Sequence, residues 1–176
     1  MGVIEEVLDA NQSYARGFSL GHLPMPPARK LAVVACMDAR LTVEQILGLK
    51  TGDAHIIRNA GGIVTEDVVR SLVISHHLLG TEEFVIINHT DCGMLTFKDE
   101  QLLAKLEEQT GTSAVAPSHF HAFSDVRNNV RQQIKRVLAH PWIPERIPVR
   151  GFVYDVKTGR LEEVFASGKA QGASAR

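Results

Sequence analysis

The sequence lacks most of the features that mark secreted and membrane-spanning proteins. Only two of its 176 residues are cysteines, one is a tryptophan and two are tyrosines. Two cysteines are too few for the disulfide framework of a small secreted domain, and in a reducing compartment such thiols more often bind a metal or react. The apolar runs are no longer than a strand, so we expect no membrane-spanning segment.

An excess of charge of one sign is missing as well. The net charge is −1, which gives no electrostatic attraction to nucleic acid or to an anionic membrane surface. Near the start of the chain, Glu5 and Glu6 interrupt the apolar residues, a pattern unlike that of a secretory leader. We therefore expect a cytoplasmic protein with no nucleic-acid partner and no membrane partner.

What is present is an alternation of short apolar runs and amphipathic segments. The apolar runs predict strands over 30–36, 54–57, 83–88, 149–154 and 161–165. Helical spacing predicts helices over 3–16, 42–47, 65–79 and 97–106, and one opened by Ser124 that ends before Pro141. Strands alternating with helices predict an α/β fold, a mainly parallel central sheet flanked by helices, with a C-terminal antiparallel edge hairpin.

Two cysteines and a histidine follow neighbouring strands of this predicted sheet. Cys36 ends the first strand, and His89 and Cys92 come directly after the third. The carboxyl ends of parallel strands meet at one edge, so we expect these three side chains to lie together. Two thiolates and one imidazole with a fourth position open are typical of a catalytic zinc ion. The alternatives are two ordinary buried thiols, or a closed zinc-stabilised or redox-sensing module.

Asp38 and Arg40 follow Cys36, the first of these ligands, at two and four residues. In extended backbone their side chains point the same way, so Arg40 can hold the Asp38 carboxylate in a bidentate pair. Asp38 can then accept the proton of a zinc-bound hydroxide and orient it. The alternatives are an unremarkable ion pair at a strand end, or Asp38 as a fourth zinc ligand that closes the site.

A glycine-rich loop follows the second predicted strand at the same edge of the sheet. It runs from Arg58 through Asn59, Ala60 and Gly61 to Gly62, and its glycines allow the backbone to approach the site closely. A dinucleotide-binding loop is disfavoured, because the spaced three-glycine fingerprint is absent and the loop follows the second strand.

The chain divides into three parts. Residues 1–28 are expected to form a helix and a proline-rich arm that pack on a partner subunit, so that the protein is a homodimer or homotetramer. Residues 29–167 are expected to form the zinc-binding α/β domain. Residues 168–176 are small and polar, and we expect a disordered tail.

The motifs Cys36-Met-Asp38-Ala-Arg40 and His89-Thr-Asp-Cys92-Gly93 resemble those of the β-class carbonic anhydrases. The likeness is strongest to the short prokaryotic branch, which includes carbonyl sulfide hydrolases. The resemblance implies one Zn²⁺ per chain held by Cys36, His89 and Cys92, with Asp38 and Arg40 as the catalytic dyad. It also implies a substrate pocket near Arg58, Asn59, Ala60, Gly61 and Gly93.

By the same resemblance, the expected reaction is the reversible hydration of carbon dioxide to bicarbonate and a proton by zinc-bound hydroxide. The alternative is hydrolysis of carbonyl sulfide or carbon disulfide at the same zinc site, with release of H₂S. The motifs are specific for the zinc site and much less specific for the substrate.

Overall fold

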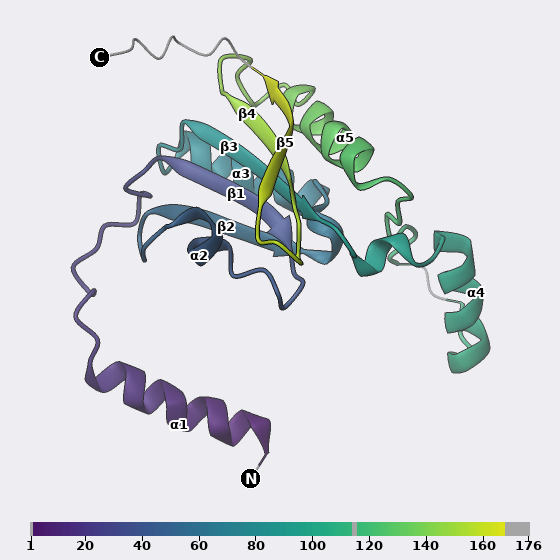
Figure 1. The fold of residues 1–176 in the computed structure, drawn as a ribbon, viewed down its shortest axis with the longest axis horizontal. Helices are drawn as coiled ribbons and strands as arrows, with labels where there is room; N and C mark the ends of the chain where they lie inside the picture. Colours follow the sequence, from purple (N-terminus) through teal and green to yellow (C-terminus); the bar gives the residue numbers. More distant parts are fainter. Residues whose placement is uncertain (1, 114–115, 168–176) are drawn as a thin grey trace.

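The computed structural model describes residues 2–113 and 116–167, and within them the chain forms one five-stranded sheet (Figure 1). Its strand order is β2-β1-β3-β4-β5; the first four strands are parallel and β5 is antiparallel to β4. The strands are β1 (Leu31–Cys36), β2 (Ala54–Asn59), β3 (Glu83–His89), β4 (Val149–Tyr154) and β5 (Leu161–Ser167). The predicted fold class is confirmed. The predicted disordered tail, 168–176, lies outside the described residues.

The helices form close to their predicted positions, with some differences at their ends, and α2, α3 and α5 flank the sheet. They are α1 (Val3–Arg16), α2 (Val43–Leu47), α3 (Glu66–His77), α4 (Asp99–Thr110) and α5 (Val126–Leu138), with 3-10 turns η1 (Ala60–Gly62) and η2 (Gly93–Leu95). Helix α5 is capped by Asp125 and not by the predicted Ser124, because the Asp125 carboxylate accepts the backbone N–H of Asn128 over 2.7 Å. Helix α4 begins two residues later than predicted, at Asp99, whose carboxylate binds the backbone of the loop before α5.

The two faces of the sheet are covered unequally. Helices α3 and α5 cover one face, where their apolar side chains join those of the strands in the largest core cluster. The opposite face carries the five-residue α2 and a smaller cluster around Val33, Val43 and Ile87. A groove of about 340 Å³ remains open on that face, and Leu31, Val85 and Leu161 are among the residues that line it.

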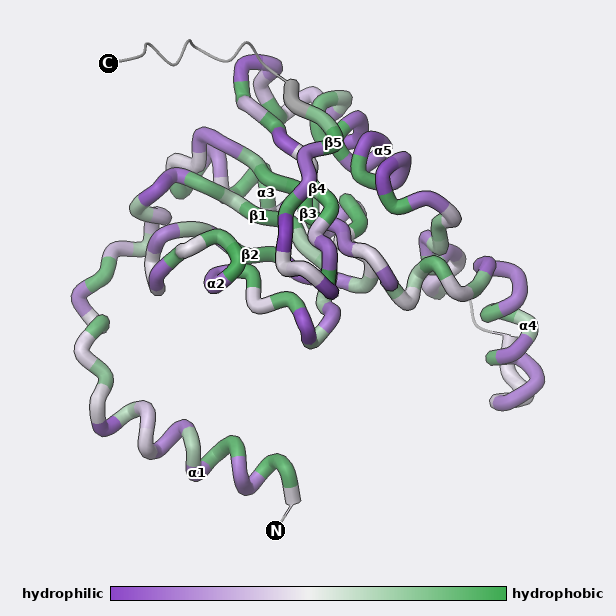
Figure 2. Tube along the Cα trace, viewed as in Figure 1, coloured by the Kyte–Doolittle hydropathy of each residue, from purple (hydrophilic) through white to green (hydrophobic). Residues whose placement is uncertain are grey.

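Helix α1 stands away from the rest of the described chain (Figures 1 and 2). None of its residues is buried, although Val3, Ile4, Val7 and Leu8 form an apolar stripe along it. An exposed stripe of this kind leaves apolar surface in water, so α1 lacks a packing partner among residues 2–113 and 116–167. None of the described helices is both long and apolar enough to cross a membrane.

The parallel register brings two strand ends to the same edge of the sheet. Strand β1 ends at Cys36 and strand β3 ends at His89. Ala35 and Ile87 are partners in the parallel register, so the two neighbouring strands end close together. The loop after β1 and the turns η1 and η2 meet at this edge. Sheets of this type bind ligands beyond the carboxyl ends of their strands.

Candidate metal centre

The side chains of Cys36, His89 and Cys92 converge at the carboxyl ends of β1 and β3. One possible ligand atom from each lies within 4.8 Å of the other two, and all three residues are buried. The strands are positioned by their apolar side chains, so the ligand residues are fixed by packing on both faces of the sheet. Two sulfurs and one ring nitrogen at this spacing suit a tetrahedral metal with one open position.

The imidazole of His89 is arranged as a metal ligand. Its Nδ1 lies 2.8 Å from the carbonyl oxygen of Thr90, which can only accept a hydrogen bond, so Nδ1 carries the proton. Its Nε2 is buried and has no hydrogen-bond partner within the described residues. A buried lone pair without a donor costs free energy, and a metal ion bound by these three residues would satisfy it. The donor set therefore fits a zinc ion.

The sulfur atoms of Cys36 and Cys92 lie within 4.8 Å of each other. The hydrogen bond from Cys92 stabilises the Cys36 thiolate and lowers the pKa of Cys36, while the same contact raises the pKa of Cys92. Both cysteines are free. A divalent cation held by this pair would favour the thiolate form of both cysteines, and its binding would release their protons.

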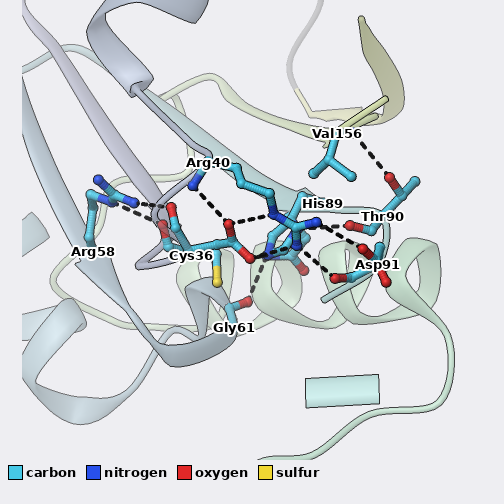
Figure 3. Close-up of polar contacts among 10 residues, drawn as sticks. Cys36, Arg40, Arg58, Gly61, His89, Thr90, Asp91 and Val156 are labelled. Atoms are coloured by element: carbon cyan, nitrogen blue, oxygen red, sulfur yellow. Dashed lines mark hydrogen bonds and ion pairs between the residues drawn. The ribbon is translucent and has the colours of Figure 1, made fainter. Parts of the chain in front are cut away.

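Asp38 and Arg40 form the bidentate pair that the sequence suggests (Figure 3). Arg40 donates from Nε to Asp38 Oδ1 over 2.9 Å and from Nη2 to Oδ2 over 2.8 Å. These bonds hold the pKa of Asp38 well below its usual range, so the carboxylate stays ionised. Its Oδ2 lies 3.8 Å from Nε2 of His89, beside the cluster of possible ligands.

Two residues expected near a substrate pocket, Arg58 and Asn59, bind backbone groups. Arg58 donates from Nε to the carbonyl of Cys36 over 2.9 Å and from Nη2 to that of Asp38 over 2.7 Å. The side chain of Asn59 accepts from the N–H of Ile63 and donates to its carbonyl, both over 2.8 Å. Both side chains thus shape the loops that carry the site.

The small residues of the expected pocket lie in the two turns. Ala60 and Gly61 are in η1 and Gly93 begins η2. Gly61 has φ +79°, and a Cβ there would lie 3.0 Å from Met94 Cγ. The position therefore requires glycine for both conformation and space. Gly93 is exposed and has open space around its Cα.

Two features of the site were not identified from the sequence. Asp91 provides a second carboxylate for Arg40, which donates from Nη1 to Asp91 Oδ2 over 2.8 Å. Behind the site, Asn129 on α5 binds Asn88, the residue before His89. Asp91 lies within the second motif, so the motif offered a signal for it. Nothing in the spacing of the α5 residues distinguishes Asn129 from a surface asparagine.

The strand order and the buried Cys-His-Cys cluster define an α/β protein with a possible metal site at its strand ends. A family model described as carbonic anhydrase matches residues 31–161. β-Carbonic anhydrase 1 of Mycobacterium tuberculosis is 48% identical over 165 residues, which cover 93% of this chain and 99% of the relative. The chain belongs to the β-carbonic anhydrase family.

Solved structures and a related branch agree with this assignment. The crystal structure of carbonic anhydrase from Streptococcus mutans has a TM-score of 0.88 at 45% identity, and the match covers 94% of this chain and 99% of that chain. A carbon disulfide hydrolase of Acidithiobacillus thiooxidans is 36% identical over 174 residues, covering 85% of this chain and 87% of the relative. The family thus includes relatives named for different substrates.

Proposed function

We propose that the protein is a zinc enzyme that catalyses the reversible hydration of carbon dioxide to bicarbonate and a proton. The observation that carries this proposal is the buried triad of Cys36, His89 and Cys92, whose unpaired His89 Nε2 lies beside an arginine-held carboxylate. One zinc ion bound by the three residues would acidify a water molecule and supply the hydroxide nucleophile.

Asp38 is proposed to orient the attacking hydroxyl group. Because its pKa is depressed, the carboxylate is present throughout the neutral range and only accepts hydrogen bonds. An acceptor fixed beside Cys36, His89 and Cys92 would accept a hydrogen bond from the hydroxyl group and so direct an oxygen lone pair toward the substrate. Arg40 is proposed to keep Asp38 in that orientation through its two hydrogen bonds. Both residues act as catalytic groups in this proposal.

Hydrolysis of carbonyl sulfide or carbon disulfide is the second candidate, since one relative is named carbon disulfide hydrolase. Hydroxide would attack the carbon atom of either substrate: carbonyl sulfide and one water molecule would give carbon dioxide and one H₂S, and carbon disulfide and two water molecules would give carbon dioxide and two H₂S. A stopped-flow assay with carbon dioxide, run beside H₂S detection with carbonyl sulfide and carbon disulfide, tests the proposal. We expect hydration to be the fastest reaction. Rapid H₂S release without hydration would favour the second candidate. If the protein catalyses neither reaction, both candidate functions are rejected.

We further propose that residues 1–28 pack on a second copy of the chain, giving a homodimer or homotetramer. The support is the apolar stripe of α1, which has no packing partner in the described part of the chain, together with the α2 face of the sheet, where a groove stays open. Burying Val3, Ile4, Val7 and Leu8 would stabilise the assembly by about 1.5–3 kcal/mol per side chain. Sedimentation of the full chain should therefore show dimers or larger species at micromolar concentration.

The variant Val7→Glu tests the role of α1 in assembly. A charge within the apolar stripe should shift the protein toward monomer, whereas Glu6→Gln should leave the assembly unchanged. A wild-type protein that sediments as an active monomer would reject the proposal. Because two reduced cysteines serve as proposed ligands, we also propose a reducing location such as the cytoplasm.

A further inference from the structure

Arg40 is shared between two carboxylate residues, and only one of them belongs to the proposed dyad. In addition to its bonds to Asp38, its Nη1 donates to Asp91 Oδ2 over 2.8 Å and its Nη2 donates to the Asp91 carbonyl over 2.9 Å (Figure 3). The Arg40 side chain is 46% exposed, so burial alone does not fix its rotamer. Its orientation depends on these hydrogen bonds.

Asp91 lies between the proposed ligands His89 and Cys92 and adopts a left-handed backbone conformation with φ 55°. Few non-glycine residues adopt this conformation, although Asp and Asn tolerate it better than most. Both the carbonyl and the carboxylate of Asp91 meet the same guanidinium. The Asp91 side chain is 71% exposed, so its contact with Arg40 does not result from burial.

We propose that Asp91 is a positioning residue that fixes the guanidinium of Arg40 to the loop between His89 and Cys92. With Asp38 as its only partner, Arg40 could move together with the carboxylate. With Asp91 as a second anchor, the Arg40 guanidinium stays in place, and Asp38 must break its two hydrogen bonds to that guanidinium, as well as the one from the Arg40 backbone N–H, to change its orientation. The expected effect of Asp91 on turnover rests on the proposed function, because Asp91 acts through Arg40 and Asp38.

A simpler explanation is that Asp91 matters only because it tolerates the left-handed backbone of the loop between His89 and Cys92. Two variants distinguish this explanation from the proposal. Asp91→Gly favours the left-handed backbone and removes the carboxylate, so it preserves the turn and breaks the Nη1 contact. Asp91→Asn retains the turn and a neutral acceptor. The matched control is Asp67→Asn, which weakens an exposed Arg70–Asp67 ion pair of the same 2.8 Å length on α3.

We expect Asp91→Gly to lower kcat about tenfold, less than the hundredfold loss typical of a removed catalytic group. The Michaelis constant and the zinc content of Asp91→Gly should stay near those of the wild type. The kcat of Asp91→Asn should lie between that of the wild type and that of Asp91→Gly. In an Arg40→Ala background, Asp91→Gly should change the rate less than about twofold, because the two residues act as one unit. An equal loss in both backgrounds, or no loss in either, would overturn the inference.

A second measurement does not depend on the substrate. The N–H at Nε of Arg40 should exchange with solvent slowly in the wild type and several-fold faster in Asp91→Gly, as followed by ¹⁵N NMR of the zinc-loaded protein. Asp67→Asn should leave this exchange unchanged. If carbon dioxide is not hydrated, the proposed function fails, and faster exchange in Asp91→Gly still supports the anchor. Unchanged exchange in Asp91→Gly rejects the anchor for any substrate.

Discussion

The side-chain amide of Asn129 on α5 donates to the side-chain oxygen of Asn88 on β3 over 2.7 Å, and both residues are buried. Asn88 donates in turn to the carbonyl of Gly61 over 2.9 Å, and Gln133 donates to Asn129 over 2.7 Å. Because Asn88 precedes His89 and Gly61 lies in η1, this buried network connects α5 with two of the segments that form the metal centre. A polar network of this kind stabilises the fold only while every member is paired.

Replacing Asn129 with leucine should therefore destabilise the protein. The change preserves side-chain size but leaves the Asn88 oxygen and the Gln133 amide unpaired in the core. Each unpaired group costs about 1–3 kcal/mol, so the free energy of unfolding should fall by roughly 2 kcal/mol or more. Urea unfolding of the zinc-loaded protein measures this change. The exposed neighbour Asn128 is the control, and Asn128→Leu should change stability by less than about 0.5 kcal/mol.

If Cys36, His89 and Cys92 hold a zinc ion as proposed, the zinc content should be roughly one ion per chain. Cys92→Ser should lose most of the zinc and much of the stability, because a serine hydroxyl is a poor zinc ligand and the fold gains free energy from the bound ion. Elemental analysis and thermal unfolding, each before and after chelation, provide the measurements. Protein purified without chelator that contains no zinc and remains fully active would contradict the site.

The dyad is tested by Arg40→Ala. Freed from Arg40, Asp38 can bind the metal at the open position, so turnover should fall about a hundredfold while the zinc content stays near wild type. Asp38→Asn should also retain zinc and lose rate, because an amide is a weaker acceptor for the hydroxyl hydrogen. Arg70→Ala removes a comparably exposed arginine far from the motifs and serves as the control. Near-wild-type rates for Arg40→Ala across mildly acidic to alkaline pH would reduce the dyad to an ion pair.

The stability of the segment before α5 should depend on pH through Asp99. Its carboxylate accepts the backbone N–H groups of Ala122, Phe120 and His121, which lower the pKa of Asp99 below its usual range. The folded state then holds this proton less tightly than the unfolded chain does. The contribution is fully present above the unfolded pKa of about 3.9 and is lost as pH falls through the folded pKa.

Comparison of Asp99→Asn with wild type isolates this contribution. The stability difference between the two proteins should be constant from pH 6 to 8 and should shrink below about pH 4, where the wild-type carboxyl becomes protonated. Urea unfolding across this range, with Asp67→Asn as a second exposed-carboxylate control, provides the measurement. A difference that grows on acidification would show that the sign of the Asp99 pKa shift is opposite to the one described here.

Much of the fold could be predicted because its strands are short apolar runs and its helices have clear amphipathic spacing. The order of the elements and the parallel sheet follow from local patterns and the handedness of strand crossovers. The ends of the helices were less predictable, because neighbouring residues compete to cap them: Asp125 and not Ser124 caps α5, and Gln101 binds the backbone N–H of Lys98 just before α4. Asp99 begins α4 while binding residues about twenty positions later, and no local pattern contains that contact.

The site shows the same division. The two motifs identified Cys36, His89 and Cys92 as residues to be brought together at the strand ends, because strand direction places them there. The partners of Arg58 could not be predicted, since its bonds to the Cys36 and Asp38 carbonyls depend on how β2 lies beside β1. The pairing of Asn129 with Asn88 likewise requires α5 to cross the sheet at one particular place.

The position of the three ligands also has a consequence for the unfolded chain. Cys36 and His89 are separated by about 50 residues, so a metal ion that stays bound to both during unfolding acts as a topological cross-link. Closing a loop of this length lowers the unfolded-state entropy by an amount equivalent to about 4 kcal/mol on the scale used for disulfides. Zinc would then slow the opening of β1 and β3 more than that of the other strands. The backbone amides of these two strands would exchange with solvent faster after the zinc is removed.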